Sequence, residues 1–200
     1  MNDLVAYLVN RGTLRTERII AAFDKVDRAG FVVPEHRGHP YVDIPLPIGC
    51  CQTISQPYTV AFMLELLSPK EGERILDVGS GSGWTAALLS KIVGQKGFVY
   101  GVERVPELVR FGRDNVERAG IKNTEIVQAG DELGLKEKAP FDRILVSASA
   151  QELPAELVGQ LKAGGTMVIP VGRAVWKVVR KPAGKTDVEK FEGFAFVPLV

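Results

Sequence analysis

A short run of glycines that follows an aspartate is the part of this sequence best suited to chemistry. Gly79, Gly81 and Gly83 alternate with serines after the hydrophobic run that contains Asp77. This order predicts a buried strand that passes through a glycine turn into a helix, Trp84 to Val93. The N–H groups at a helix start are unpaired, and glycines lack the Cβ atoms that hold a ligand away. The turn is therefore predicted to bind a nucleotide-like ligand through its backbone.

Two acids indicate which nucleotide-like ligand fits. Residues 81–86 also match the dinucleotide pattern G-x-G-x-x-A, so a pyrophosphate-bearing cofactor is the alternative. Asp77 would repel a phosphate, whereas Glu103, at the end of the next expected strand, can accept hydrogen bonds from both hydroxyls of a ribose. S-adenosylmethionine has an adenosine, a sulfonium cation and no phosphate. The sequence therefore predicts S-adenosylmethionine as the cofactor.

A second polar segment precedes a helix. Pro57 suits the first turn of that helix. The helix has an apolar face made of Val60, Met63, Leu64 and Leu67. Hydrogen-bonding side chains fill the predicted loop before it: Gln52, Thr53, Ser55 and Gln56. Taken alone, these side chains are explained by local capping of the helix.

The rest of the chain alternates expected strands and helices, which is typical of a mostly parallel sheet covered by helices. Five strands are expected to begin at Arg74, Phe98, Thr124, Phe141 and Thr166, and to end at Val78, Glu103, Ala129, Ala148 and Val171. Helices are expected at Pro106 to Ala119 and Glu152 to Leu161, with two short amphipathic ones, Leu4 to Val9 and Glu17 to Val26, ahead of the sheet. Val175 to Arg180 and Phe191 to Val200 are expected to form an antiparallel hairpin around a polar turn.

Ligands of an open α/β sheet bind at the carboxyl ends of its parallel strands. Asp77, Glu103, Asp131 and Ser147 are therefore expected to lie on one rim. Asp131 is placed to reach an adenine amino group, and its alternative is a turn or capping role. Trp84 either shields the sugar of the cofactor or packs at the start of its helix.

The composition indicates a compact enzyme. The chain has 200 residues, a net charge of +1 and 46% hydrophobic residues, which suits one domain over residues 1–200. Residues 1–56 would form N-terminal helices and a loop, and residues 57–200 the core. Balanced charge argues against a nucleic-acid groove. No apolar run is long enough to span a membrane and the start lacks a signal-peptide profile, so a cytoplasmic protein is expected.

Cysteine and histidine chemistry is not expected. Cys50 and Cys51 are adjacent, which suits neither a disulfide framework nor a zinc site, so free thiols are predicted. His36 and His39 lie in a proline-flanked segment that is interpreted as a surface loop, and no metal site is predicted. Neither histidine stands beside a recognisable nucleophile.

Several segments together resemble the protein-L-isoaspartate O-methyltransferase family. The most specific is the run 52–57, Gln-Thr-Ile-Ser-Gln-Pro, combined with Leu76 to Gly83. Further matching segments are Pro45 to Gly49, Ala139 to Asp142, Pro170 to Gly172 and Phe196 to Leu199. The glycine turn is shared by many methyltransferases, whereas the Thr-Ile-Ser-Gln-Pro element is specific to this family.

The resemblance implies methyl transfer from S-adenosylmethionine to the free carboxylate of L-isoaspartyl residues in damaged proteins and peptides. The methyl ester then collapses to a succinimide, whose hydrolysis restores part of the normal aspartyl linkage. A carboxylate with a pKa of about 4 is already ionised at neutral pH, so the reaction needs no general base. The implied fold is a doubly wound, mostly parallel, seven-stranded Rossmann-like α/β sheet with helices on both faces, an antiparallel C-terminal hairpin and a small N-terminal helical extension.

The resemblance also implies roles for individual residues. Ser55 matches the active-site serine, Thr53 is a supporting donor, and Val197 on the last strand pairs with the substrate backbone. The implied cofactor-binding residues are Ile54, Ser55, Gln56, Pro57, Asp77, Gly79, Gly81, Ser82, Gly83, Glu103, Asp131 and Glu132.

The sequence departs from the family pattern at Cys51 and Glu132, where glycine is usual, and over Ser147 to Gln151, where the family has an alanine- and proline-rich rim. Two other functions stay open: methylation of tRNA or a small molecule, and S-adenosylmethionine binding without catalysis. The expected protein is a monomer whose partners are isoaspartyl proteins, with no nucleic acid and no membrane.

Overall fold

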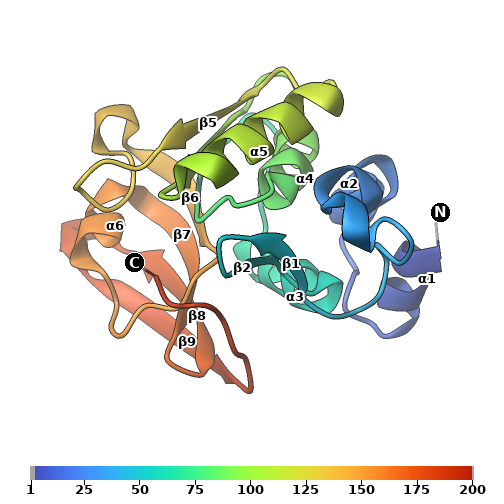
Figure 1. The fold of residues 1–200 in the computed structure, drawn as a ribbon. Coiled ribbons are helices and arrows are strands. Elements are labelled where there is room, and N and C mark those ends of the chain that lie inside the picture. Colours follow the sequence, from blue (N-terminus) through green and yellow to red (C-terminus); the bar gives the residue numbers. More distant parts are fainter. Residues whose placement is uncertain (1–2, 200) are drawn as a thin grey trace.

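A single twisted sheet organises the computed structural model, which describes residues 3–199 (Figure 1). Its seven strands follow the order β5-β4-β3-β6-β7-β8-β9; the first five pair parallel, whereas β8 pairs antiparallel with both β7 and β9. The strands are β3 (Arg74–Val78), β4 (Phe98–Glu103), β5 (Thr124–Gln128), β6 (Phe141–Val146), β7 (Leu161–Val171), β8 (Ala174–Arg180) and β9 (Thr186–Glu192). The predicted fold class is confirmed.

Helices cover the two faces of the sheet unequally. The helices are α1 (Asp3–Asn10), α2 (Glu17–Lys25), α3 (Pro57–Leu67), α4 (Trp84–Val93), α5 (Pro106–Arg118) and α6 (Ala155–Gln160), with short 3₁₀ turns η1 (Arg28–Phe31), η2 (Pro34–His36), η3 (Lys136–Lys138) and η4 (Pro182–Gly184). Residues of α1 to α5 share one hydrophobic cluster with Ile75, Val99 and Leu145 of the sheet. Alternate strand residues, such as Leu76 and Ile144, face the opposite side, where α6 packs. The N-terminal helices α1 and α2 thus extend this cluster beyond α3 and α4, against which α2 packs.

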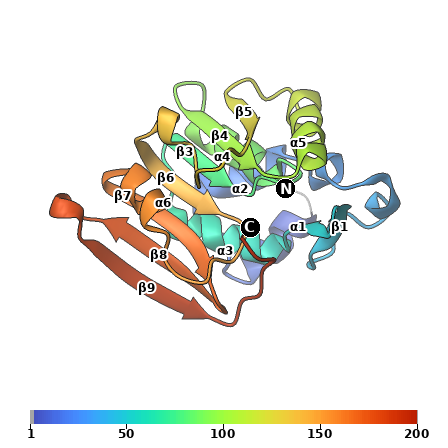
Figure 2. The ribbon, with the colours of Figure 1, turned by 60° about the vertical axis from the view of Figure 1, so that its left-hand side comes forward.

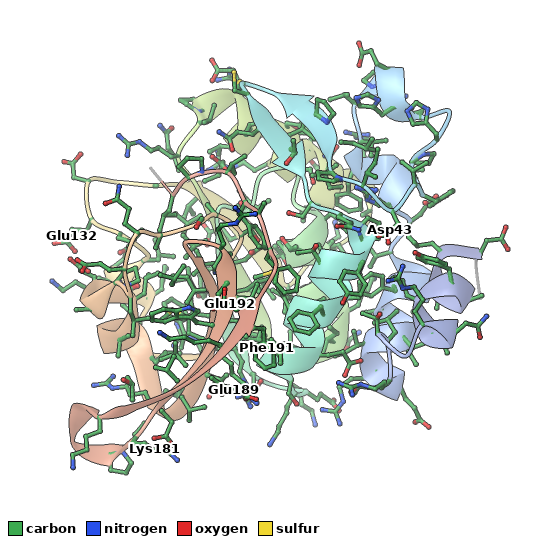
Figure 3. The ribbon with its side chains drawn as sticks, turned by 90° about the horizontal axis from the view of Figure 1, so that it is seen from below. Asp43, Glu132, Lys181, Glu189, Phe191 and Glu192 are labelled. Carbon is green, nitrogen blue, oxygen red and sulfur yellow. The ribbon has the colours of Figure 1, made fainter. Side chains whose placement is uncertain are left out.

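The C-terminal hairpin differs from its prediction. β8 pairs with Thr186–Glu192, from Ala174 opposite Glu192 to Arg180 opposite Thr186. Of the expected strand Phe191 to Val200, only Phe191 and Glu192 take part in this pairing. β9 is the outer edge of the sheet (Figure 2) and most of its side chains are exposed, so it lacks the apolar alternation that marks a half-buried strand. Phe191 is an exception: it lies beside α3 (Figure 3), with its ring centroid 5.4 Å from that of Phe62.

The helix expected at Glu152 to Leu161 is also shorter than predicted. α6 begins at Ala155 and β7 already begins at Leu161. Pro154 disfavours helical backbone at the residue before it, which excludes Glu152 and Leu153 from the helix.

Within residues 3–199, no helix has both the length and the apolar character needed to cross a bilayer.

A small hairpin replaces the predicted loop around Gln52. β1 (Leu46–Gly49) and β2 (Gln52–Ile54) pair antiparallel, and Cys50 and Cys51 form the two-residue turn between them. Both cysteines are free and exposed and have positive φ, +51° and +57°. Two-residue hairpin turns of this kind favour asparagine and glycine, so two cysteines gave no turn signal.

The Cys51→Gly variant is expected to be more stable than the parent. Glycine adopts positive φ without the Cβ clash, so the free energy of unfolding should rise by about 1 kcal/mol. Urea unfolding measures this change, with Cys51→Ser as the control that keeps the Cβ. The activity implied by the family resemblance is expected to stay the same or rise. Loss of most of that activity in a folded Cys51→Gly protein would indicate that the thiol takes part in the reaction.

Candidate active site

The glycine turn between β3 and α4 is held against the neighbouring strand. The N–H groups of Gly79 and Ser80 donate to the carbonyl of Val102 at 2.8 and 3.1 Å. Gly79, Gly81 and Gly83 have φ values of +76°, +48° and +83°. Residues with a Cβ rarely adopt such positive φ values, so the turn itself requires the alternating glycines.

Glu103 fixes the turn from the end of β4. One carboxylate oxygen accepts the N–H of Gly81 at 3.0 Å and the other accepts the N–H of Val105 at 2.9 Å. The side chain is almost completely buried. Each carboxylate oxygen has a further lone pair, so Glu103 can bind a ribose hydroxyl pair while it holds the turn.

Helix α5 supports the same turn through two residues that sequence reasoning missed. The side-chain amide of Asn115 donates to the carbonyl of Ser82 at 2.9 Å. A Cβ on Gly112 would lie 2.8 Å from the carbonyl oxygen of Gly81, so only glycine allows α5 to approach this closely. Neither residue stands in a motif, because both act across more than 30 positions of sequence.

Asp77 lies beneath the turn. It is 0% exposed, and the Thr85 hydroxyl donates to one of its carboxylate oxygens at 2.6 Å. The other oxygen has no recorded partner among the described residues. Burial raises the pKa of Asp77 to about 7, opposed by the hydrogen bond from Thr85 and reinforced by the charge of Glu103. A buried acceptor without a partner favours a nearby cation or donor.

The Asp77→Asn variant is expected to change how stability depends on pH. Folding raises the pKa of Asp77 from its ordinary 3.8 to about 7, so the folded state binds more protons than the unfolded state between these values. The free energy of unfolding of the parent should therefore fall, relative to that of Asp77→Asn, by up to about 4 kcal/mol as the pH rises from 4 to 7. Chemical unfolding of both proteins across this range measures the difference. A difference that does not change with pH would contradict the burial of an ionisable Asp77.

A cavity of about 240 Å³ opens above the glycine turn, at the carboxyl ends of the parallel strands. Ten of the predicted site residues are among those that line it: Thr53, Ile54, Ser55, Gly79, Gly81, Ser82, Glu103, Asp131, Glu132 and Val197. Ser147, predicted on the rim, also lines it. Of the described residues, the lining set leaves out the other predicted ones: Gln56, Pro57, Asp77 and Gly83. Glu132 lies on an outer loop, seen at the left of Figure 3.

The β1–β2 hairpin covers one side of the cavity. A Cβ on Gly81 would lie 3.3 Å from the side chain of Ile48, so the hairpin packs directly on the glycine turn. Thr53 and Ser55 come from the end of this hairpin and line the cavity. No side-chain hydrogen bond is recorded for either hydroxyl within residues 3–199, which leaves both as donors for a ligand.

The C-terminal segment closes another side. Figure 1 shows it, in dark red, turning back from β9 toward the middle of the molecule. The Ser149 N–H donates to the carbonyl of Val197 at 2.8 Å, and the Leu199 N–H donates to the carbonyl of Ser149 at 2.8 Å. This pairing fixes Val197, Pro198 and Leu199 as part of the cavity wall.

Trp84 and the histidines have mainly structural surroundings. Trp84 lines the cavity but is only 2% exposed, and its ring meets that of Phe23 edge to face at 5.6 Å. It therefore packs at the helix start as well as bordering the site. His36 and His39 contact each other at 5.5 Å between ring centroids. Among the described residues, no group of three or more His, Cys, Asp or Glu side chains could hold a metal ion.

Comparison with known proteins identifies the family. The model of the family described as Protein-L-isoaspartate(D-aspartate) O-methyltransferase (PCMT) matches residues 1–200. The chain belongs to this family. The family member of Thermococcus onnurineus is 48% identical over 98% of this chain and 91% of its own length, and that of Pyrococcus horikoshii is 43% identical over 98% and 90%.

A solved structure of the same family has the same fold. The protein-L-isoaspartate O-methyltransferase of Plasmodium falciparum, crystallised with S-adenosyl-L-homocysteine, superposes with a TM-score of 0.86. It is 29% identical, and the match covers 98% of this chain and 96% of that one. The predicted resemblance to the protein-L-isoaspartate O-methyltransferase family is confirmed.

Proposed function

We propose that the protein repairs damaged proteins by methylating the free carboxylate of their L-isoaspartyl residues, with S-adenosylmethionine as the methyl donor. One observation carries this proposal: a single cavity is lined both by the anchored glycine turn and by Thr53 and Ser55, whose hydroxyls have no recorded side-chain hydrogen bond within the described part of the chain. Membership of the protein-L-isoaspartate O-methyltransferase family supports the same reaction.

The residues around the cavity suit S-adenosylmethionine. Glu103 accepts the ribose hydroxyls, and Asp131 binds the adenine amino group at the exposed rim. When ionised, buried Asp77 gives the floor beneath the turn a negative potential that disfavours a phosphate, and a bound sulfonium cation favours this ionised form. When bound, S-adenosylmethionine supplies a methyl carbon made electrophilic by its sulfonium charge.

The acceptor end needs donors rather than a base. The described lining residues include no histidine, lysine or cysteine, and both oxygens of Glu103 already accept backbone N–H groups. An isoaspartyl carboxylate is ionised at neutral pH, so it reacts without proton removal. Ser55 and Thr53 donate hydrogen bonds that orient this carboxylate without neutralising it. Alignment and exclusion of water then account for the rate.

The C-terminal segment offers an edge for the peptide backbone of the substrate. The carbonyl of Val197 already accepts the Ser149 N–H, so its backbone groups point towards that side. Backbone groups of neighbouring residues alternate in direction along an extended segment. We therefore assign the pairing edge to Phe196 and the carbonyl of Pro198, next to Val197.

A methyl-transfer assay tests this function. The protein is incubated with labelled S-adenosylmethionine and, separately, an isoaspartyl peptide, its aspartyl counterpart and bulk tRNA. Base-labile label on the isoaspartyl peptide alone is the expected result. Label on tRNA would assign a different acceptor, and cofactor binding without transfer to any acceptor would indicate a non-catalytic protein.

We further propose that the protein acts as a cytoplasmic monomer on protein rather than nucleic-acid substrates. The exposed thiols of Cys50 and Cys51 suit a reducing compartment. The net charge of +1 provides no strong attraction to a polyanion. Light scattering coupled to size-exclusion chromatography, with and without isoaspartyl peptide, tests the monomeric state.

A further inference from the structure

A buried arginine lies directly behind the proposed acceptor site. Arg28, the first residue of η1, is 1% exposed, and its Nη2 donates to the carbonyl oxygen of Ser55 at 3.0 Å. Its other recorded acceptors are the carbonyls of Pro40, 2.8 Å from Nη1, and Ile44, 3.5 Å from Nη2. The guanidinium carbon is 5.1 Å from the centroid of the Trp84 ring. Arg28 therefore touches two residues that line the cavity, Ser55 and Trp84.

The charge of Arg28 has no close carboxylate partner. Arg28 takes part in none of the ion pairs recorded within residues 3–199. Asp43, which lies beside α3 in Figure 3, acts on it electrostatically, but its oxygens accept the Tyr58 N–H at 2.8 Å and the Tyr7 hydroxyl at 3.2 Å. Burial lowers the pKa of Arg28 to about 10, so the guanidinium stays charged at neutral pH.

Within residues 3–199 the recorded partners of this buried cation are three carbonyls and the Trp84 ring, none of which carries a negative charge, and such a cation is costly to keep. Carbonyl dipoles satisfy its donors but do not neutralise its charge, so its positive potential extends into nearby space. The Nε atom lacks even such an acceptor among the described residues. A neutral side chain could fill the same space without this cost. The buried charge is therefore explained by attraction to an anion that binds only during the reaction.

The cavity gives an anionic acceptor little other attraction. Its charged lining residues are the three acids Glu103, Asp131 and Glu132 and one base, Arg104, and Asp77 lies beneath. Arg104 is exposed and follows Glu103 at the end of β4, whereas Ser55 follows β2. Acids at the cofactor end suit a sulfonium but repel a carboxylate. A buried cation behind Ser55 opposes that repulsion at the acceptor end.

We propose that Arg28 is a positioning residue: its guanidinium holds the Ser55 carbonyl and its positive charge draws the acceptor carboxylate to the Ser55 hydroxyl. This inference rests on the proposed function and names the chemistry that the site selects, an anionic rather than a neutral acceptor. Arg28 acts through Ser55 and through its electric field, without touching the substrate.

Neutralising Arg28 tests the effect on the acceptor. Arg28→Met should raise KM for an isoaspartyl peptide by about tenfold, with a smaller change in kcat, because a charge in a poorly solvated site acts over several ångströms. Arg28→Lys keeps the charge and should recover most of the loss in KM. Arg180→Met is the matched control, since Arg180 also donates to backbone carbonyls, those of Gly159 and Leu161, but lies outside the cavity lining.

Cofactor binding supplies a readout with the opposite sign. S-adenosylmethionine is a sulfonium cation, whereas the sulfur of S-adenosylhomocysteine is neutral. Arg28→Met removes a nearby positive charge and should therefore strengthen binding of S-adenosylmethionine relative to S-adenosylhomocysteine. The expected change is about threefold in the ratio of the two Kd values, measured by calorimetry. A purely structural role for Arg28 would weaken both ligands equally and leave their ratio unchanged.

The inference is overturned if Arg28→Met leaves both KM and the Kd ratio unchanged. It is also overturned if Arg104→Met raises KM for the peptide while Arg28→Met does not. Should Arg28→Met fail to fold, Arg28→Gln, which keeps one amide donor for the carbonyls, is tested for the same two ratios with the same expected signs. A parent protein that does not methylate the peptide would refute the proposed function, whereas the Kd ratio would still decide the role of the Arg28 charge.

Discussion

Ser55→Ala is expected to bind S-adenosylmethionine nearly as tightly as the parent while kcat/KM for an isoaspartyl peptide falls by about tenfold to a thousandfold, the range for loss of one positioned donor. The Ser55 hydroxyl has no recorded partner within residues 3–199 and lines the cavity, so its removal leaves the fold and the glycine turn intact. Steady-state kinetics and calorimetry measure the two effects separately. Ser68→Ala, which removes an exposed hydroxyl outside the cavity lining, is the control.

Two results would contradict this role of Ser55. One is a Ser55→Ala enzyme as fast as the parent. The other is a methylated serine detected by mass spectrometry, which would indicate covalent catalysis. A nucleophilic serine needs an adjacent base, and the described lining residues provide no histidine, lysine or cysteine for that purpose.

Glu103→Ala is expected to weaken S-adenosylmethionine binding by about tenfold to a hundredfold, because hydrogen bonds to charged groups contribute about 1.5–3 kcal/mol. The substitution removes the ribose acceptor and also leaves the N–H groups of Gly81 and Val105 without partners. Glu103→Gln keeps one acceptor oxygen and should lose less affinity. Calorimetry tests both variants against Glu107→Ala, which removes an exposed acid from α5; an unchanged Kd in Glu103→Ala would refute the assignment of the ribose site.

The sequence predicted those parts of the site that are built from neighbouring residues. The glycine turn and Glu103 were recognisable because a strand, its turn and the next strand follow one another along the chain. Ser55 was found through the family resemblance, since the residues around it suggested only capping. The contacts that hold these groups in place were not predictable, because Arg28 reaches Ser55 across 27 positions and Asn115 reaches Ser82 across 33.

The fold was predictable where the side chains of a segment form a clear apolar pattern. Four of the parallel strands, β3, β4, β6 and β7, were found because they contain apolar runs that are buried on both faces, whereas β5 was found from its place after the helix that ends at Gly120. β9 was missed because most of its side chains face solvent. The β1–β2 hairpin was missed because Cys50 and Cys51 adopt a backbone that glycine or asparagine normally signals. Asp77 was expected on the rim, yet it is 0% exposed and lies beneath the turn. Its burial depends on α4, whose Thr85 hydroxyl donates to it, and this contact was not predicted from the sequence.

The walls of the cavity come from segments that are synthesised at very different times. Ile48 and Gln52 to Ser55 form one side, the glycine turn forms the floor, and Val197 to Leu199 form another side. A nascent chain on the ribosome therefore carries the complete cofactor-binding turn for more than a hundred residues of elongation before its last wall exists. Until residue 199 has emerged and paired with Ser149, the turn stays open to solvent along that side. Formation of the closed site therefore depends on the arrival of Val197 to Leu199 and not on the folding of the central sheet alone.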